Sequence, residues 1–142
     1  MKEIKSRNYV LLSICNHSLS YNHKMKAEIK YLHSPDVDNL KEYQPQEKDN
    51  FGFLLQVMIG PKGEKGEESF DMMVVTPKWL MEKYGPDEVV FGKHYVIVFE
   101  YNYDNLYNRL QYTVDGLGEK DWNALALKLA RLGHWEFDDY KE

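Results

Sequence analysis

The residues of this chain that could carry chemistry lie in a few short segments, and the first is rich in glycine. Three glycines, spaced three residues apart, interrupt lysines and glutamates over residues 60–68. A phosphate-binding P-loop needs a glycine followed by Lys and then Ser or Thr, so that backbone amides and the lysine surround the phosphate. That order does not occur here, and Glu64, Glu67 and Glu68 would repel a phosphate. The segment therefore predicts a long hairpin loop.

A second segment, near the end of the chain, alternates residue types that bind metals. His134, Glu136 and Asp138 are separated by single residues, so in an extended backbone their side chains would share one face. Such a set could hold a divalent ion. The same alternation is more typical of a terminal strand whose polar face meets solvent. We expect the strand, and we expect no metal and no other cofactor.

Covalent catalysis has little support in the residue pattern. The only cysteine is Cys15, and no serine stands in a Gly-x-Ser-x-Gly turn. A pair of carboxylates acting as in glycosidases is defined by its separation in space, which spacing along the chain does not give. We therefore expect no enzymatic activity, and a carboxylate-based hydrolase is kept as an alternative to a binding protein.

The charge of the chain narrows the class of partner. The chain has 18 basic and 23 acidic residues, a net charge of −5. Residues 1–24 hold four basic residues and one acidic residue, a net +3, so residues 25–142 carry −8. Nucleic acids and anionic membranes are polyanions, so we expect neither as a partner and favour a basic protein. A net charge of this size also serves solubility alone.

Length and composition fit one folded domain. The chain has 142 residues, of which 43% are hydrophobic and 14% aromatic, enough for a single core. A single cysteine excludes an intramolecular disulfide and favours a reducing compartment, so we expect the protein in the cytoplasm. No apolar run approaches the roughly 18 residues that span a bilayer.

Residues 1–24 differ from the rest of the chain. Lys2, Lys5 and Arg7 precede an apolar run over residues 9–14, an order similar to that of a secretory signal. The run is short for that purpose, and Ile14 occupies a position that needs a small residue before cleavage. We interpret residues 1–24 as an N-terminal extension, either poorly ordered or produced by an upstream start, and residues 25–142 as the domain.

Alternating apolar residues predict four strands, over residues 27–31, 51–59, 70–74 and 95–101. Every second residue from Phe51 to Ile59 is apolar and defines one buried face. In the third strand Phe70 and Met72 share a face, and Asp71 points the other way.

Three helices are predicted after the third strand. Thr76 and Pro77 form a start signal, since the hydroxyl caps free amides and proline fits the first helical position. The second helix covers residues 103–117, where apolar residues recur at helical spacing, and the third covers residues 122–131. The order β-β-β-α-β-α-α predicts an α+β fold, with a mainly antiparallel sheet of about four strands and helices packed on one face. Trp79, Trp122 and Phe53 are assigned to the core.

Acidic residues gather in two places that could contact a protein. Glu64, Glu67, Glu68 and Asp71 lie at or beside the predicted hairpin, and a second group lies near the end of the chain, namely Glu136, Asp138 and Asp139. Both groups are interleaved with glycine or aromatic residues, which suits docking against a basic surface with aromatic anchors. If the hairpin binds, reversing Glu67 and Glu68 to lysine should slow association without lowering the melting temperature.

Five extended blocks carry a resemblance to a known family. They are Asp49-Asn-Phe-Gly-Phe, Gly60-Pro-Lys-Gly, Glu68-Ser-Phe-Asp71, Thr76-Pro-Lys-Trp-Leu80 and Gly133-His-Trp-Glu-Phe. With these blocks, residues 25–140 resemble the immunity protein 8 family of bacterial polymorphic toxin systems. Residues 114–120 depart from the family pattern.

The resemblance implies a cytoplasmic antidote that binds and neutralises a cognate toxin domain by direct contact, with no catalysis and no cofactor. An acidic antidote suits a basic toxin, such as a nuclease whose cleft binds a polyanion. The family assigns no contact residues, so the two acidic groups above are our own hypothesis for the toxin-binding site. A small acidic adaptor or regulatory domain is the alternative, and it would have a stable partner but no toxic neighbour.

Overall fold

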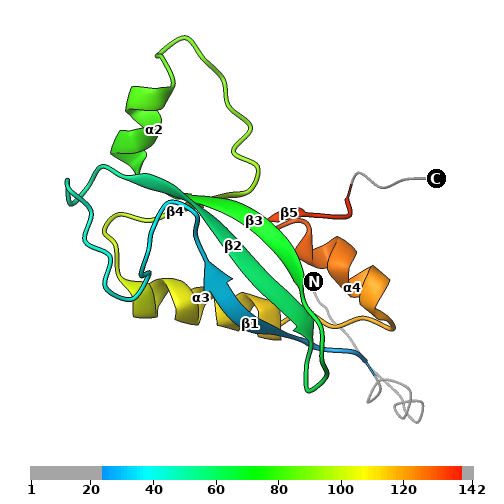
Figure 1. Ribbon diagram of the computed structural model, residues 1–142. Helices are drawn as coiled ribbons and strands as arrows, with labels where there is room; N and C mark the ends of the chain where they lie inside the picture. Colours follow the sequence, from blue (N-terminus) through cyan, green and yellow to red (C-terminus); the bar gives the residue numbers. More distant parts are fainter. Residues whose placement is uncertain (1–23, 139–142) are drawn as a thin grey trace, which may run out of the picture.

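The computed structural model describes residues 24–138, so the expectations for residues 1–23 and for Asp139 lie outside it. The described residues form five strands and three helices (Figure 1). In chain order these are β1 (Ala27–His33), β2 (Gly52–Pro61), β3 (Glu68–Val75), α2 (Pro77–Lys83), β4 (Tyr95–Ile97), α3 (Tyr103–Asp115), α4 (Trp122–Leu129) and β5 (His134–Trp135). The predicted α+β fold is confirmed.

The sheet is mixed, in the order β1-β2-β3-β4. The first three strands are antiparallel neighbours, and Phe53 lies opposite Val74 in the register of β2 and β3. The helix-containing crossover after β3 returns the chain to the same end, so β4 runs parallel to β3. The short strand β5 pairs antiparallel with β3, placing Trp135 opposite Phe70.

The prediction that the fourth strand continues to Tyr101 is wrong, because its partner strand ends first. The amide of Val98 donates to the carbonyl of Val75, the last residue of β3, at 2.9 Å. The next residue, Thr76, caps α2, so β3 has no further backbone groups to form hydrogen bonds with residues 99–101. Tyr101 instead packs among Tyr43, Phe51 and Phe53.

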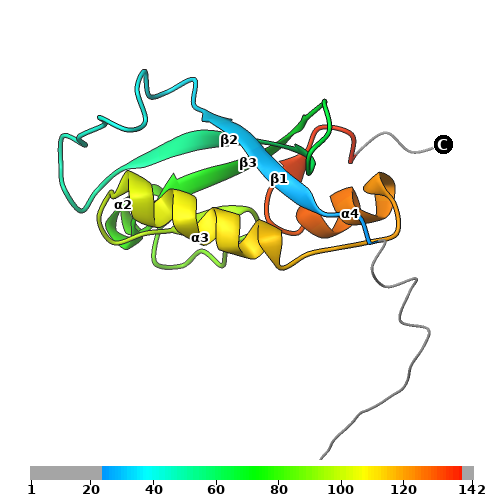
Figure 2. The same cartoon turned by 90° about the horizontal axis from the view of Figure 1, so that it is seen from below.

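The core lies between the sheet and two of the helices. Figure 2 shows α3 and α4 on one side of β1, β2 and β3. The inward face of β2 is buried at every second residue, as predicted, from Phe53 through Ile59. Leu106, Leu110 and Val114 of α3 are buried in the same core cluster, which confirms the helical spacing found in the sequence.

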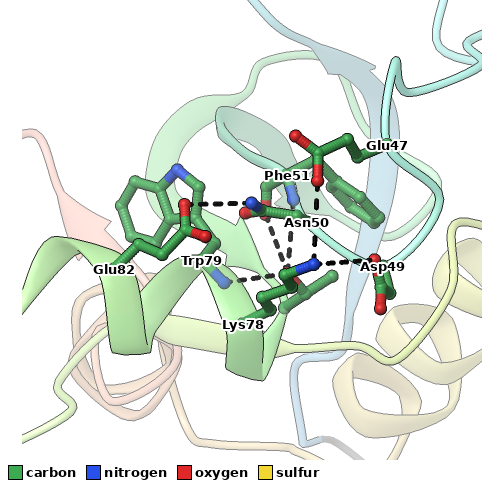
Figure 3. Close-up of polar contacts among 8 residues, drawn as sticks. Glu47, Asp49, Asn50, Phe51, Lys78, Trp79 and Glu82 are labelled. Atoms are coloured by element: carbon green, nitrogen blue, oxygen red, sulfur yellow. Dashed lines mark hydrogen bonds and ion pairs between the residues drawn. The ribbon is translucent and has the colours of Figure 1, made fainter.

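The helix α2 lies beyond the end of the sheet (Figure 1) and has no buried residue. Figure 3 shows how it is attached. Thr76 Oγ1 accepts hydrogen bonds from the amides of Trp79, at 3.3 Å, and of Phe51, at 3.2 Å. Asn50 donates to the Glu82 carboxylate at 3.0 Å. Backbone caps and polar contacts therefore hold α2, with little help from the core.

The core assignment is confirmed for Phe53, which is 2% exposed, and is wrong for Trp79. The Trp79 indole is half-buried and lies against Gly52, where a Cβ would come within 2.5 Å of the indole Cε2. Trp122 is half-buried at the margin of the core. Within residues 24–138, no helix has the length and apolar character needed to cross a membrane.

Candidate partner-binding surfaces

The loop between β2 and β3 holds Glu64 and Glu67 in exposed positions. Gly63 and Gly66 have φ values of 77° and 103°, which side chains other than glycine rarely adopt. The loop is tied to β1, because the Glu28 carboxylate accepts the Gly63 amide at 2.9 Å and Lys30 donates to the Glu64 carbonyl at 2.6 Å. The predicted hairpin loop is therefore present and braced.

The ties between the loop and β1 also set the electrostatics of Glu28. The hydrogen bond from Lys30, followed by that from the Gly63 amide, holds the pKa of the Glu28 carboxyl below its usual value. The same carboxylate thus accepts hydrogen bonds from a residue of β1 and from the loop.

Glu68 differs from its neighbours in the loop because it lies in β3 on the core side. It shares the parity of Phe70 and Met72, and one of its oxygens accepts two indole N–H groups, from Trp122 at 2.9 Å and from Trp135 at 2.8 Å. Glu68 therefore joins β3 to α4 and β5. Glu68→Lys removes the carboxylate that accepts both indole N–H groups. The expectation that reversing Glu67 and Glu68 leaves the melting temperature unchanged therefore does not fit this arrangement.

Three further acidic residues lie around the pairing of β3 with β5. Ser69 donates its amide to the Glu136 carboxylate at 2.6 Å and its hydroxyl to Asp71 at 2.5 Å. The amide of Glu136 donates back to the Ser69 carbonyl at 3.2 Å. Asp138 donates its amide to the Trp135 carbonyl, which turns the chain after β5.

The structure thus brings together five acidic residues from the two groups found in the sequence. We call Glu67, Glu68, Asp71, Glu136 and Asp138 the acidic edge, because they lie on β3, on β5 or close to these strands, although Glu68 has the parity of the core face and Asp71 that of the opposite face. Glu64 lies apart from it, in the part of the loop tied to β1. Among residues 24–138, no Lys or Arg forms an ion pair with any of the five. Their charges are left to attract a basic surface.

Two carboxylates of the acidic edge are engaged within the fold. Glu68 and Glu136 accept hydrogen bonds from indoles and from a backbone amide. Within the part of the chain that the structure describes, no three His, Cys, Asp or Glu side chains are grouped closely enough to hold a metal. The Glu136 carboxylate accepts the Ser69 amide, and it forms no metal-binding group with His134 and Asp138 in the described chain.

A second surface was not found in the sequence. A groove of about 610 Å³ lies between α2, the loop 84–94 and β4, and we call it the apolar groove. Its walls include Leu80, Met81, Tyr84, Val90, Tyr95 and Ile97. Met81, which lines it, is 77% exposed, while Phe91 in the loop 84–94 and Phe99, two residues after β4, are 90% and 73% exposed. A contiguous exposed apolar patch is typical of an interaction site.

The apolar groove is held open by contacts between its two sides. The hydroxyls of Tyr84, after α2, and Tyr95, in β4, share a hydrogen bond of 2.5 Å. That bond, with burial, raises the pKa of Tyr95. A signal for this surface exists in the sequence, where Val89, Val90 and Phe91 stand together in a loop that begins with Gly85-Pro86.

Comparison with known proteins gives one family. A family model described as Immunity protein 8 matches residues 27–140, which include every strand and helix described above. No curated protein and no solved structure matches the chain.

Proposed function

Since this chain belongs to the immunity protein 8 family, we propose that it binds and neutralises a cognate toxin domain of a polymorphic toxin system by direct protein contact. An immunity protein has a toxin as its partner, and its family is in general not enzymatic. The match over residues 27–140, nearly the whole fold, is the observation that carries the proposal.

The acidic edge, together with Glu64, is the toxin-contacting surface that charge favours. Five carboxylates without cationic partners in the described chain would speed the approach of a basic toxin. Electrostatic steering brings association rates toward about 10⁸ M⁻¹s⁻¹ at low salt. A basic toxin such as a nuclease fits this surface, and the cytoplasm, where such a toxin would act, fits the single cysteine.

The apolar groove is a second contact surface for the same toxin, favoured by the exposed side chains of Met81, Phe91 and Phe99. Charged residues at an interface mainly affect the association rate, whereas buried aromatic and aliphatic side chains mainly affect the dissociation rate. A toxin that covers the groove with its own apolar side chains would dissociate slowly. The two surfaces therefore make separable contributions to one complex.

Cell survival tests the proposal. The C-terminal domain of the adjacent toxin-like gene is expressed alone, together with this chain, or together with an unrelated acidic domain of similar net charge. Rescue by this chain, and failure of the unrelated domain, is the expected result. A toxic neighbour that this chain does not rescue would contradict neutralisation of that toxin.

The adaptor alternative predicts a different outcome in the same setting. A regulatory adaptor would bind a stable partner that is harmless when expressed alone. A copurified partner without toxicity, together with a harmless neighbouring gene product, would therefore favour the adaptor over the antidote.

A further inference from the structure

A cavity of about 310 Å³ lies between β4, α3 and the turn that follows α4, and we call it the basic pocket. Its wall includes Lys93, His94, Arg109 and Arg131, and its apolar lining includes Met72 and Leu110. The volume falls at the lower end of the range for small-molecule sites. Among the residues that the structure describes, no acidic one lines it.

Two features distinguish the basic pocket from an ordinary solvated surface. The whole sequence has three arginines, and both of those in the described chain line this one cavity. The ion pairs formed among residues 24–138 use Lys30, Lys48, Lys78 and Lys128, and none uses Lys93, Arg109 or Arg131. Three cations without an acidic partner in the described part of the chain thus share one cavity, in a protein whose net charge is −5.

The walls of the pocket are held by specific contacts. His94 has a φ of 65°, uncommon for a residue other than glycine, and this turns the chain into β4. Its Nε2 contacts the Ala130 carbonyl at 2.8 Å, while its own carbonyl accepts the Met73 amide. The Arg109 guanidinium lies 5.8 Å from the centre of the Tyr112 ring, within the range of a cation–π contact.

We propose that the basic pocket binds a small phosphate monoester, a dianion carried on a compact apolar or aromatic body. Two guanidinium groups and one ammonium match a doubly charged tetrahedral anion, since arginine donates in pairs to phosphate oxygens. Met72 and Leu110 offer apolar contact to the body of the ligand. The proposal goes beyond toxin binding and does not depend on it.

Titration of the full chain tests the proposal with phenyl phosphate, inorganic phosphate and phenol as probes. Amide chemical shifts and isothermal calorimetry report binding. We expect phenyl phosphate to bind more tightly than inorganic phosphate, phenol not to bind, and the shifted amides to be those of residues 92–96, 109–113 and 131–132. Binding of phenol as tight as that of phenyl phosphate, or shifts confined to other residues, would overturn the proposal.

Charge variants provide the matched comparison. Arg109→Gln/Arg131→Gln should weaken phenyl phosphate binding by at least about tenfold, the loss expected for one charge-assisted hydrogen bond. Lys48→Gln/Lys78→Gln removes the same charge from exposed lysines elsewhere and should leave binding within about twofold. Equal weakening in both variants would show a nonspecific charge effect and overturn the proposal. Arg109→Lys keeps the charge, and it should still weaken binding because the paired donors are lost.

Discussion

The Glu68 carboxylate accepts the indole N–H of Trp135, 67 residues further along the chain, at 2.8 Å. The same oxygen accepts the indole of Trp122 from α4. One acidic side chain thus fixes a helix and the terminal strand to β3. Glu68 is therefore a structural residue of the fold as well as part of the acidic edge, and experiments on the surface charge must keep the two roles apart.

Glu68→Ala should lower the free energy of unfolding by about 1–3 kcal/mol, because two indole donors lose their acceptor. Glu68→Gln keeps an amide oxygen in place and should lose less. Urea unfolding followed by tryptophan fluorescence measures the difference. Glu67→Ala, at the exposed neighbouring position, should change stability by no more than about 0.5 kcal/mol. Equal effects at the two positions would contradict the structural role of Glu68.

Glu28 should make the stability of the domain sensitive to acid. Its pKa is held below the usual 4.5 by Lys30 and the Gly63 amide. A carboxyl whose pKa is lower in the folded state contributes stability that is present above the unfolded value and is lost as the pH falls through the folded value. Free energies of unfolding measured from neutral pH downward should therefore fall less steeply below pH 4.5 in Glu28→Gln than in the parent chain. Identical slopes would show that the carboxylate makes no such contribution.

Periodicity was enough to predict the two central strands and their buried face. Apolar residues recur at every second position of β2 and β3, and these two strands form an antiparallel pair with one buried face. The local pattern and the tertiary packing therefore agree. The same alternation carries Glu68 onto the face of Phe70, and counting back from Phe70 would have revealed its inward position. Residue type alone assigns this carboxylate to the surface, whereas its register in β3 places it on the inward face.

The features missed in the sequence depend on contacts between separate elements, which the local residue pattern does not show. The length of β4 is set by where β3 ends, at Val75, and its own residues give no sign of this. The apolar groove lies between α2, the loop 84–94 and β4, and the hydrogen bond of Tyr84 with Tyr95 joins two of these segments. Trp79 is a large aromatic residue of the kind usually found in a core. However, α2 lies beyond the end of the sheet, so the indole is only half-buried.

Reversing two loop charges should change how fast the toxin binds. Glu64 and Glu67 are exposed, and no side-chain contact of theirs within residues 24–138 would be lost. Glu64→Lys/Glu67→Lys should slow association with a basic toxin by about tenfold at low salt and flatten the salt dependence, with an unchanged melting temperature. Stopped-flow binding measures the rate. Asp38→Lys/Glu42→Lys makes the same change of charge at exposed positions away from both proposed surfaces, and an equal slowing there would mean that net charge alone steers the toxin.

The apolar groove should govern how long the complex lasts. Phe91 and Met81 are 90% and 77% exposed, so Met81→Ser/Phe91→Ser should leave the free energy of unfolding within about 0.5 kcal/mol of the parent value. If the toxin covers these side chains, the loss of anchors at an interface should raise the dissociation rate by about tenfold or more while the association rate changes little. Tyr112→Ser removes a side chain that is 73% exposed outside the groove and is the matched control. Surface plasmon resonance separates the two rates, and dissociation rates equal to that of the control would remove the groove from the interface.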